Sequence, residues 1–161
     1  MLETFMPASY GQIQSGVKAG LVNEVHTNMY QGTKNPDVRD ALAAFLIGTG
    51  PLAYFSGPYG WQITQTWSDP TGIEDIRRRW LPEFDKPLGE AKGQAVYDAT
   101  TQLVTREFAS GTKAIFDHSN NQGTIEWSDG TMTKGPGCPA SAKSCQQCDP
   151  PDYKVCTGHP A

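Results

Sequence analysis

The sequence predicts an α/β fold that is followed by an all-β region. Residues 1–55 alternate between short apolar segments of strand length and segments whose apolar residues recur with helical spacing. Residues 96–127 instead contain short alternating segments separated by glycine-bearing turns. The first pattern is typical of parallel strands joined by helices, and the second is typical of an antiparallel meander.

The first region contains two complete strand–helix repeats and a third strand. In order, we expect a strand at 1–5, a helix at 10–20, a strand at 21–26, a helix at 37–47 and a strand at 52–55. Gly20 marks the end of the first helix, and Pro36 stands near the first turn of the second. We expect the first strand to end close to Glu3, so that this carboxylate lies at the strand exit.

The second region begins after a linker at 83–93 that is punctuated by proline and glycine. The predicted strands are 96–97, 103–108, 112–117 and 124–127. The predicted turns between the last three strands lie at 110–111 and 119–123, where Ser, Gly and Asn gather. A small antiparallel β domain over 83–128 follows from this pattern.

Composition and charge exclude several classes of function. The chain has 161 residues, 37% of them apolar, and a net charge of −4, which allows a packed core but argues against a nucleic-acid partner. The basic run at 77–79 lies among acidic residues in a helix-like segment, as on a solvated helix face. No apolar run reaches the roughly 18 to 20 residues of a membrane helix, so we expect no membrane partner.

The four cysteines lie within a proline-rich tail at 129–161. They follow the spacing C-x6-C-x2-C-x7-C, at Cys138, Cys145, Cys148 and Cys156. Two disulfides are the favoured interpretation, and a zinc site or a redox-active Cys145–Cys148 pair are the alternatives. Disulfides indicate a secreted or extracellular protein. Because the first residues lack a signal peptide, we expect the chain to be the C-terminal part of a longer one.

An aromatic segment at 45–67 carries the first indication of a ligand. An apolar run suited to burial opens there into glycine, proline and aromatic residues, as in loops that present flat faces to a ligand. Carbohydrates have matching flat faces and many hydroxyls, so the sequence predicts sugar contacts by these side chains. The predicted substrate-binding aromatic residues are Tyr54, Tyr59, Trp61 and Trp67. Burial in the core is the alternative for each, above all for Tyr54.

Glu3 and His26 are the candidate polar residues of the same site. If the three parallel strands are neighbours, their carboxyl ends bring Glu3, His26 and the aromatic corner together. A carboxylate in that place suits a general acid or nucleophile of glycoside cleavage, and its partner carboxylate would lie upstream of this chain. The alternatives are a solvated Glu3 near the terminus and a structural, hydrogen-bonded His26.

Three longer motifs carry a resemblance to a known class of enzymes. FLIGTGPLAYFSGPYGW, FDKPLGEAKGQA and TREFASGTKAIFDHSNNQGTIEW resemble the C-terminal third of glycoside-hydrolase-like proteins. The resemblance covers roughly residues 1–127. It implies the last βα units of a (β/α)8 barrel followed by a small β-sandwich, and it implies that Glu3 occupies a catalytic strand end. Most of such a barrel is absent from this chain.

Together these observations predict three parts and one principal function. The parts are a barrel portion at 1–82, the antiparallel β domain at 83–128 and the disulfide-stapled tail at 129–161. We expect a C-terminal fragment of a glycosidase acting on poly- or oligosaccharides, inactive alone and without a cofactor or metal. The alternatives are a non-enzymatic carbohydrate-binding module and a truncated product without function.

Overall fold

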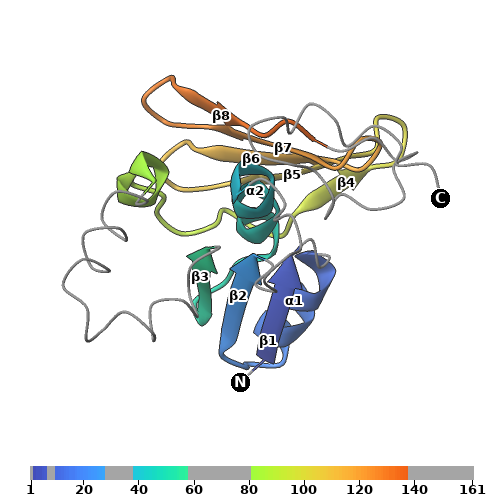
Figure 1. Cartoon of the computed structure of the whole chain (residues 1–161), viewed down its shortest axis with the longest axis vertical. Coiled ribbons are helices and arrows are strands. Elements are labelled where there is room, and N and C mark those ends of the chain that lie inside the picture. The colour runs from blue at the N-terminus through green and yellow to red at the C-terminus, as the bar shows by residue number, and fades with distance from the viewer. Residues whose placement is uncertain (1, 7–9, 28–37, 58–80, 138–161) are drawn as a thin grey trace, which may run out of the picture.

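The computed structural model describes residues 2–6, 10–27, 38–57 and 81–137 (Figure 1). The elements are β1 (Leu2–Met6), α1 (Tyr10–Lys18), β2 (Asn23–Thr27), α2 (Val38–Gly48), β3 (Ala53–Gly57), the 3-10 turn η1 (Pro82–Asp85), β4 (Val96–Asp98), β5 (Leu103–Glu107), β6 (Lys113–Asp117), β7 (Gln122–Glu126) and β8 (Met132–Lys134). The predicted change from strand–helix repeats to an antiparallel meander is confirmed.

The first sheet is parallel, with its strands in the order β1-β2-β3. Its helices pack on one face. Asn23 and Val25 of β2 are fully buried, and Gly16 of α1 lies so close to Asn23 that a Cβ there would come 2.0 Å from Asn23 Oδ1. Phe55 pairs with Val25 in register, and its ring lies 5.2 Å from that of Phe45 in α2. Both helices therefore cover the same side of the sheet.

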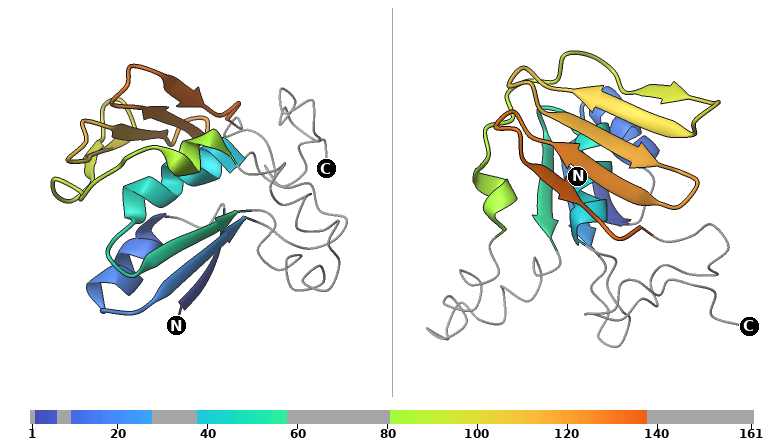
Figure 2. Two further views of the ribbon diagram at one scale, coloured as in Figure 1. Left: turned by 90° about the vertical axis from the view of Figure 1, so that its left-hand side faces the viewer. Right: turned by 90° about the horizontal axis from the view of Figure 1, so that it is seen from above.

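Helix α2 forms a central layer between two sheets (Figure 2). Every residue from 41 to 48 is buried, so the helix shows no solvent-exposed stripe over its last two turns. One side packs on the parallel sheet, and the other packs mainly on β6 and β7. No described helix is long and apolar enough to cross a bilayer.

The second sheet is antiparallel, with its strands in the order β4-β5-β6-β7-β8. Arg106, Ala114, Ile125 and Thr133 form one row across it, and all four are buried. Over the described residues this is a single sheet whose buried face packs on α2, where the resemblance implied a sandwich of two sheets. β8 lies inside the range predicted for the tail, so the sheet continues past residue 128.

Two charged side chains fix the ends of α2 to the antiparallel sheet. Near its amino end, the Asp40 carboxylate accepts hydrogen bonds from the backbone N–H groups of Gly123 (2.7 Å) and Gly137 (3.1 Å). At its carboxyl end, Arg106 Nη1 donates to the carbonyls of Ile47 (3.0 Å) and Thr49 (2.5 Å). An anion at the amino end and a cation at the carboxyl end both suit the helix dipole.

Candidate functional site

The parallel sheet places three of its residues in one row. In the register of the strands, Glu3 pairs with Glu24, and Glu24 pairs with Tyr54. Each is the second residue of its strand. Neighbouring strands are about 4.8 Å apart, so two carboxyl-bearing positions and an aromatic position adjoin one another across the sheet.

The position of Glu3 corrects one expectation. The sequence placed Glu3 at the exit of its strand, but β1 runs on through Met6. At about 3.3 Å per residue, the row lies roughly 10 Å from the carboxyl ends of the strands. The apolar pattern does not stop at Glu3, because Phe5 and Met6 extend it. Of the predicted site residues Glu3, His26 and Tyr54, only His26 lies beside the carboxyl edge, since it is the last residue but one of β2.

A β-bulge marks the carboxyl edge next to His26. Val25 pairs with Phe55, but His26 pairs with Gly57, so Ser56 is an extra residue on β3. Such bulges re-aim the strand around them and are frequent next to active sites. The break in register therefore lies where the sequence predicted the aromatic corner at 54–56.

Tyr54 and Glu24 occupy the face of the sheet away from the helices. Tyr54 is 57% exposed and Glu24 is partly exposed, whereas Val25, their neighbour on the opposite face, is fully buried. The expectation that Tyr54 packs in the core is therefore wrong, and its role as an exposed aromatic residue is the one that the geometry favours. Phe55, the next residue, instead packs against Phe45 of α2.

Sequence reasoning missed Glu24. It stands two residues before His26 in a strand with alternating burial, so the period of two alone places both positions on one face. Glu24 supplies an acidic position beside Glu3, within a chain that was expected to carry only one strong candidate. Carboxyl groups about 5–5.5 Å apart are typical of retaining glycosidases.

The remaining predicted site residues lie outside the described residues. They are the aromatic residues Tyr59, Trp61 and Trp67 and the cysteines Cys138, Cys145, Cys148 and Cys156. Among the residues that the structure does describe, no three His, Cys, Asp or Glu side chains gather as a metal site would require.

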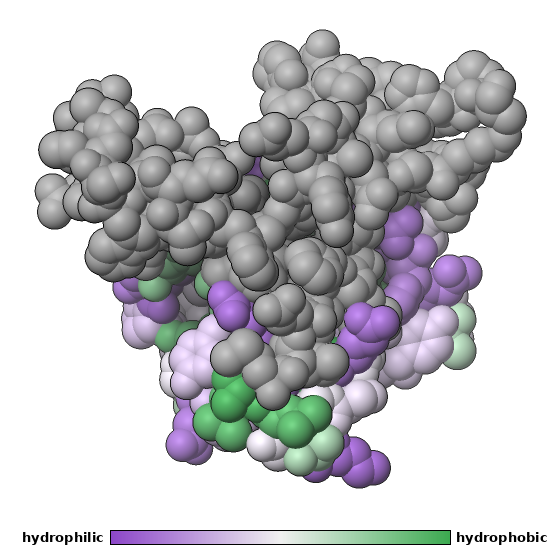
Figure 3. Space-filling view, turned by 60° about the horizontal axis from the view of Figure 1, so that its bottom comes forward, coloured by the Kyte–Doolittle hydropathy of each residue, from purple (hydrophilic) through white to green (hydrophobic). Residues whose placement is uncertain are grey.

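The opposite end of the parallel sheet is apolar. Leu21, Val22 and Leu52 lie in the turns that precede β2 and β3, and each is 36–42% exposed. Figure 3 shows apolar side chains gathered at this end of the molecule. Among the described residues, Glu24 and Tyr54 therefore lie on the face away from the helices and nearer the amino ends of their strands, whereas His26 lies toward the carboxyl edge.

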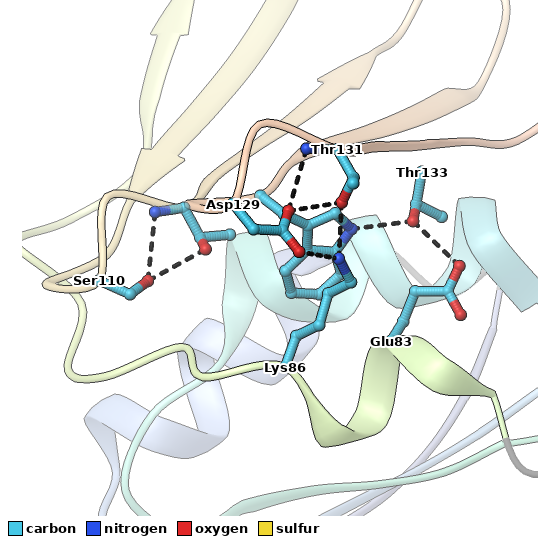
Figure 4. Close-up of polar contacts among 8 residues, drawn as sticks. Glu83, Lys86, Ser110, Asp129, Thr131 and Thr133 are labelled. Carbon is cyan, nitrogen blue, oxygen red and sulfur yellow. Dashed lines mark hydrogen bonds and ion pairs between the residues drawn. The ribbon is translucent and has the colours of Figure 1, made fainter.

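A second polar cluster joins the linker to the β7–β8 turn (Figure 4). Lys86 Nζ lies 2.6 Å from both Asp129 Oδ2 and Thr131 Oγ1, and 5.3 Å from the centre of the buried Trp127 ring. Trp127 Nε1 donates to Thr133 Oγ1 at 2.8 Å, and Thr133 donates to Glu83 Oε1 at 3.0 Å.

This second cluster is structural. The hydrogen bond from Lys86, followed by those from Thr131, holds the pKa of Asp129 well below its usual value. The hydrogen bonds of Lys86 and Thr133 described above tie η1 and the residue after it to the antiparallel sheet. Lys86, in the predicted linker, therefore has a structural role in this cluster.

Comparison with models of known protein families and with curated protein sequences finds no match to this chain. The function of the chain is therefore inferred from the arrangement of its residues.

Proposed function

We propose that this chain is the C-terminal part of a glycoside-hydrolase-like protein, in which it supplies the last βα units of a (β/α)8 barrel. The face of β1–β3 away from the helices is then the inside of the barrel, where sugar binds. Hydrolysis of a glycosidic bond in a poly- or oligosaccharide requires the complete barrel, so the chain alone is inactive.

The observation that carries this proposal is the strand order together with the placement of the helices. Parallel neighbours joined in the order β1-β2-β3 by right-handed crossovers place all their helices on one face. That is the arrangement of a (β/α)8 barrel, whereas doubly wound sheets reverse their strand order and cover both faces. On the other face Tyr54 is exposed and Glu24 is partly exposed, which favours a ligand site there rather than a core.

In this proposal the Glu3 row carries the chemistry. Glu3 is the catalytic carboxylate, and Glu24 on the neighbouring strand is the best partner within the chain. A sugar that enters from the carboxyl edge passes His26 and then reaches Tyr54 in the row. Tyr59, Trp61 and Trp67 follow β3 along the chain and supply further subsites. The cysteine tail forms two disulfides in a secreted protein.

The test uses a parent protein in which further βα units precede this chain. The Glu3→Gln variant keeps the size of the side chain but removes its charge, and we expect turnover of a neutral oligosaccharide to fall about 10²- to 10⁴-fold. Glu126→Gln, an exposed residue of β7 in the other sheet, is the matched control and leaves turnover unchanged. Retained turnover in Glu3→Gln would sink the catalytic assignment.

A non-enzymatic carbohydrate-binding module is the second candidate. The exposed Tyr54 favours it, because an aromatic ring on an open sheet face binds sugar without any acid. Under this alternative the isolated chain binds oligosaccharides without hydrolysing them. Trp61→Ala or Tyr54→Ala abolishes binding, whereas Glu3→Gln does not change it.

A further inference from the structure

Four aromatic rings gather where α1 meets the antiparallel sheet. The His118 ring lies 5.5 Å from Tyr10, 5.8 Å from Tyr97 and 5.6 Å from Phe116, measured between ring centres. Tyr10 begins α1, and Tyr97 lies in the edge strand β4. Phe116 lies near the end of β6, and His118 directly follows that strand. This cluster is on the helix side of the parallel sheet, so it is separate from the Glu3 row.

Two polar groups of this aromatic cluster converge. The Tyr10 hydroxyl lies 2.6 Å from His118 Nε2. Burial, and then the proximity of Tyr97, raises the pKa of Tyr10, so its phenol stays protonated at neutral pH. Asp98 and Asp117 are the nearest acids in sequence, and each accepts a hydrogen bond from the backbone of its own turn.

Tyr97 is far more exposed than a packing role requires. It shares a face and a register row with Val104, which is only 2% exposed, yet Tyr97 itself is 55% exposed. Its contact with His118 is T-shaped, with the ring planes 85° apart, which fixes the orientation of the Tyr97 ring. An oriented, half-exposed ring beside a hydroxyl–imidazole pair has the composition of a small-molecule subsite.

We propose that Tyr97, Tyr10 and His118 form a second carbohydrate subsite, which takes a neutral sugar residue. The Tyr97 ring packs against the C–H groups of the sugar, and the hydroxyl–imidazole pair exchanges hydrogen bonds with its hydroxyls. The four rings of the cluster include no lysine or arginine to pair with a phosphate or a carboxylate, so we expect its ligand to be a neutral sugar rather than a charged one. The choice of ligand class rests on the proposed function, but the site itself does not include the Glu3 row.

The test is a titration of the chain, labelled at tyrosine and histidine side chains for NMR, with neutral hexasaccharides of α-1,4-glucose, β-1,4-glucose, β-1,4-xylose and β-1,4-mannose. We expect at least one probe to shift the ring signals of Tyr97 and His118. Tyr97→Ala should weaken that binding about tenfold or more, in line with the loss of one stacked ring. Val96→Ala, which removes an exposed side chain from the other face of β4, is the matched control and should bind as the wild type does.

The outcomes separate this subsite from the proposed catalysis. A shift of the His118 ring signals that is lost in Tyr97→Ala and kept in Glu3→Gln supports the subsite, whatever the parent's turnover proves to be. If no neutral hexasaccharide shifts the Tyr97 and His118 signals, or if Tyr97→Ala binds as tightly as Val96→Ala, the subsite is overturned. Loss of turnover in the Glu3→Gln parent would still stand in that case, so the two failures are distinguishable.

Discussion

Arg106 shows how one residue joins the two sheets through the helix between them. It comes from β5, yet its guanidinium binds the last carbonyls of α2, and its Nε donates to the Gly93 carbonyl at 3.1 Å. Burial lowers the pKa of Arg106, which reflects the cost of holding this charge away from water. The presence of arginine in the motif TREFASGT is therefore explained by this structural role of Arg106.

We expect Arg106→Met to lower the free energy of unfolding by about 2–3 kcal/mol, because buried carbonyls lose a charged donor. Chemical denaturation measures this change. The control is Lys92→Met, which removes an exposed ion pair of 3.9 Å with Glu107 and should cost less than about 0.5 kcal/mol. Equal effects of the two substitutions would show that Arg106 is not an anchor for α2.

Asp129 predicts a pH dependence of stability. Its folded pKa lies below its ordinary value of 3.8, so its contribution is present at neutral pH and is lost as the pH falls below about 4. We expect Asp129→Asn to melt at a lower temperature than the wild type at about pH 6, and the gap to shrink toward about pH 3. A gap that stays constant over that range contradicts the assigned bond between Asp129 and Lys86.

At the scale of elements, the contact between α2 and β7 is close enough to exclude a methyl group. A Cβ at Gly123 would lie 2.6 Å from Ala43 Cβ and 2.9 Å from Asp40 Cα, and the latter atom belongs to the helix backbone. We expect Gly123→Ala to lower the free energy of unfolding by about 1–3 kcal/mol, since helix and sheet must separate.

Gly93→Ala is the matched control for this contact. A Cβ at Gly93 meets nothing within 4 Å, so the change in stability should stay within about 0.5 kcal/mol. Thermal melts of the two variants give the comparison. If Gly123→Ala were as stable as Gly93→Ala, the close packing of α2 against β7 would be wrong.

Periodicity predicted most of the elements, and the exceptions have physical reasons. β8 was missed because it is a three-residue edge strand with only Thr133 buried, and a hydrogen bond from Trp127 rather than an apolar side chain holds that position. The place of Glu3 inside β1, rather than at its exit, was missed because a short apolar run does not mark its own end. Glu24 could have been predicted from the sequence, since the alternation of residues along β2 places it on the same face as His26.

At the scale of the whole molecule, the order of the layers was beyond sequence reasoning. The composition of α2 indicated a broad apolar face, but only its contacts show that a sheet covers each side of it. The predicted division near residue 82 therefore separates two sheets that share one buried helix. Neither sheet can keep α2 from water without the other.

Such sharing predicts that the two sheets unfold together. We expect the backbone amides of α2, β2 and β5–β7 to exchange with solvent at one common free energy of opening, which is that of global unfolding. Hydrogen exchange under native conditions measures it. Amides of the antiparallel sheet that remain protected while those of α2 and β2 exchange freely would show two independent units instead.

The central claim is that the face of the parallel sheet away from the helices binds sugar. Its most direct test is an amide NMR titration with a neutral hexasaccharide. The titration uses the Tyr97→Ala variant, because this substitution removes the proposed second subsite and leaves only the site on the parallel sheet. The account predicts shifts at Glu24, His26, Tyr54 and Gly57, which span the row and the carboxyl edge. Shifts confined to the apolar turns around Leu21 and Leu52, or the absence of any shift at saturating sugar, would contradict it.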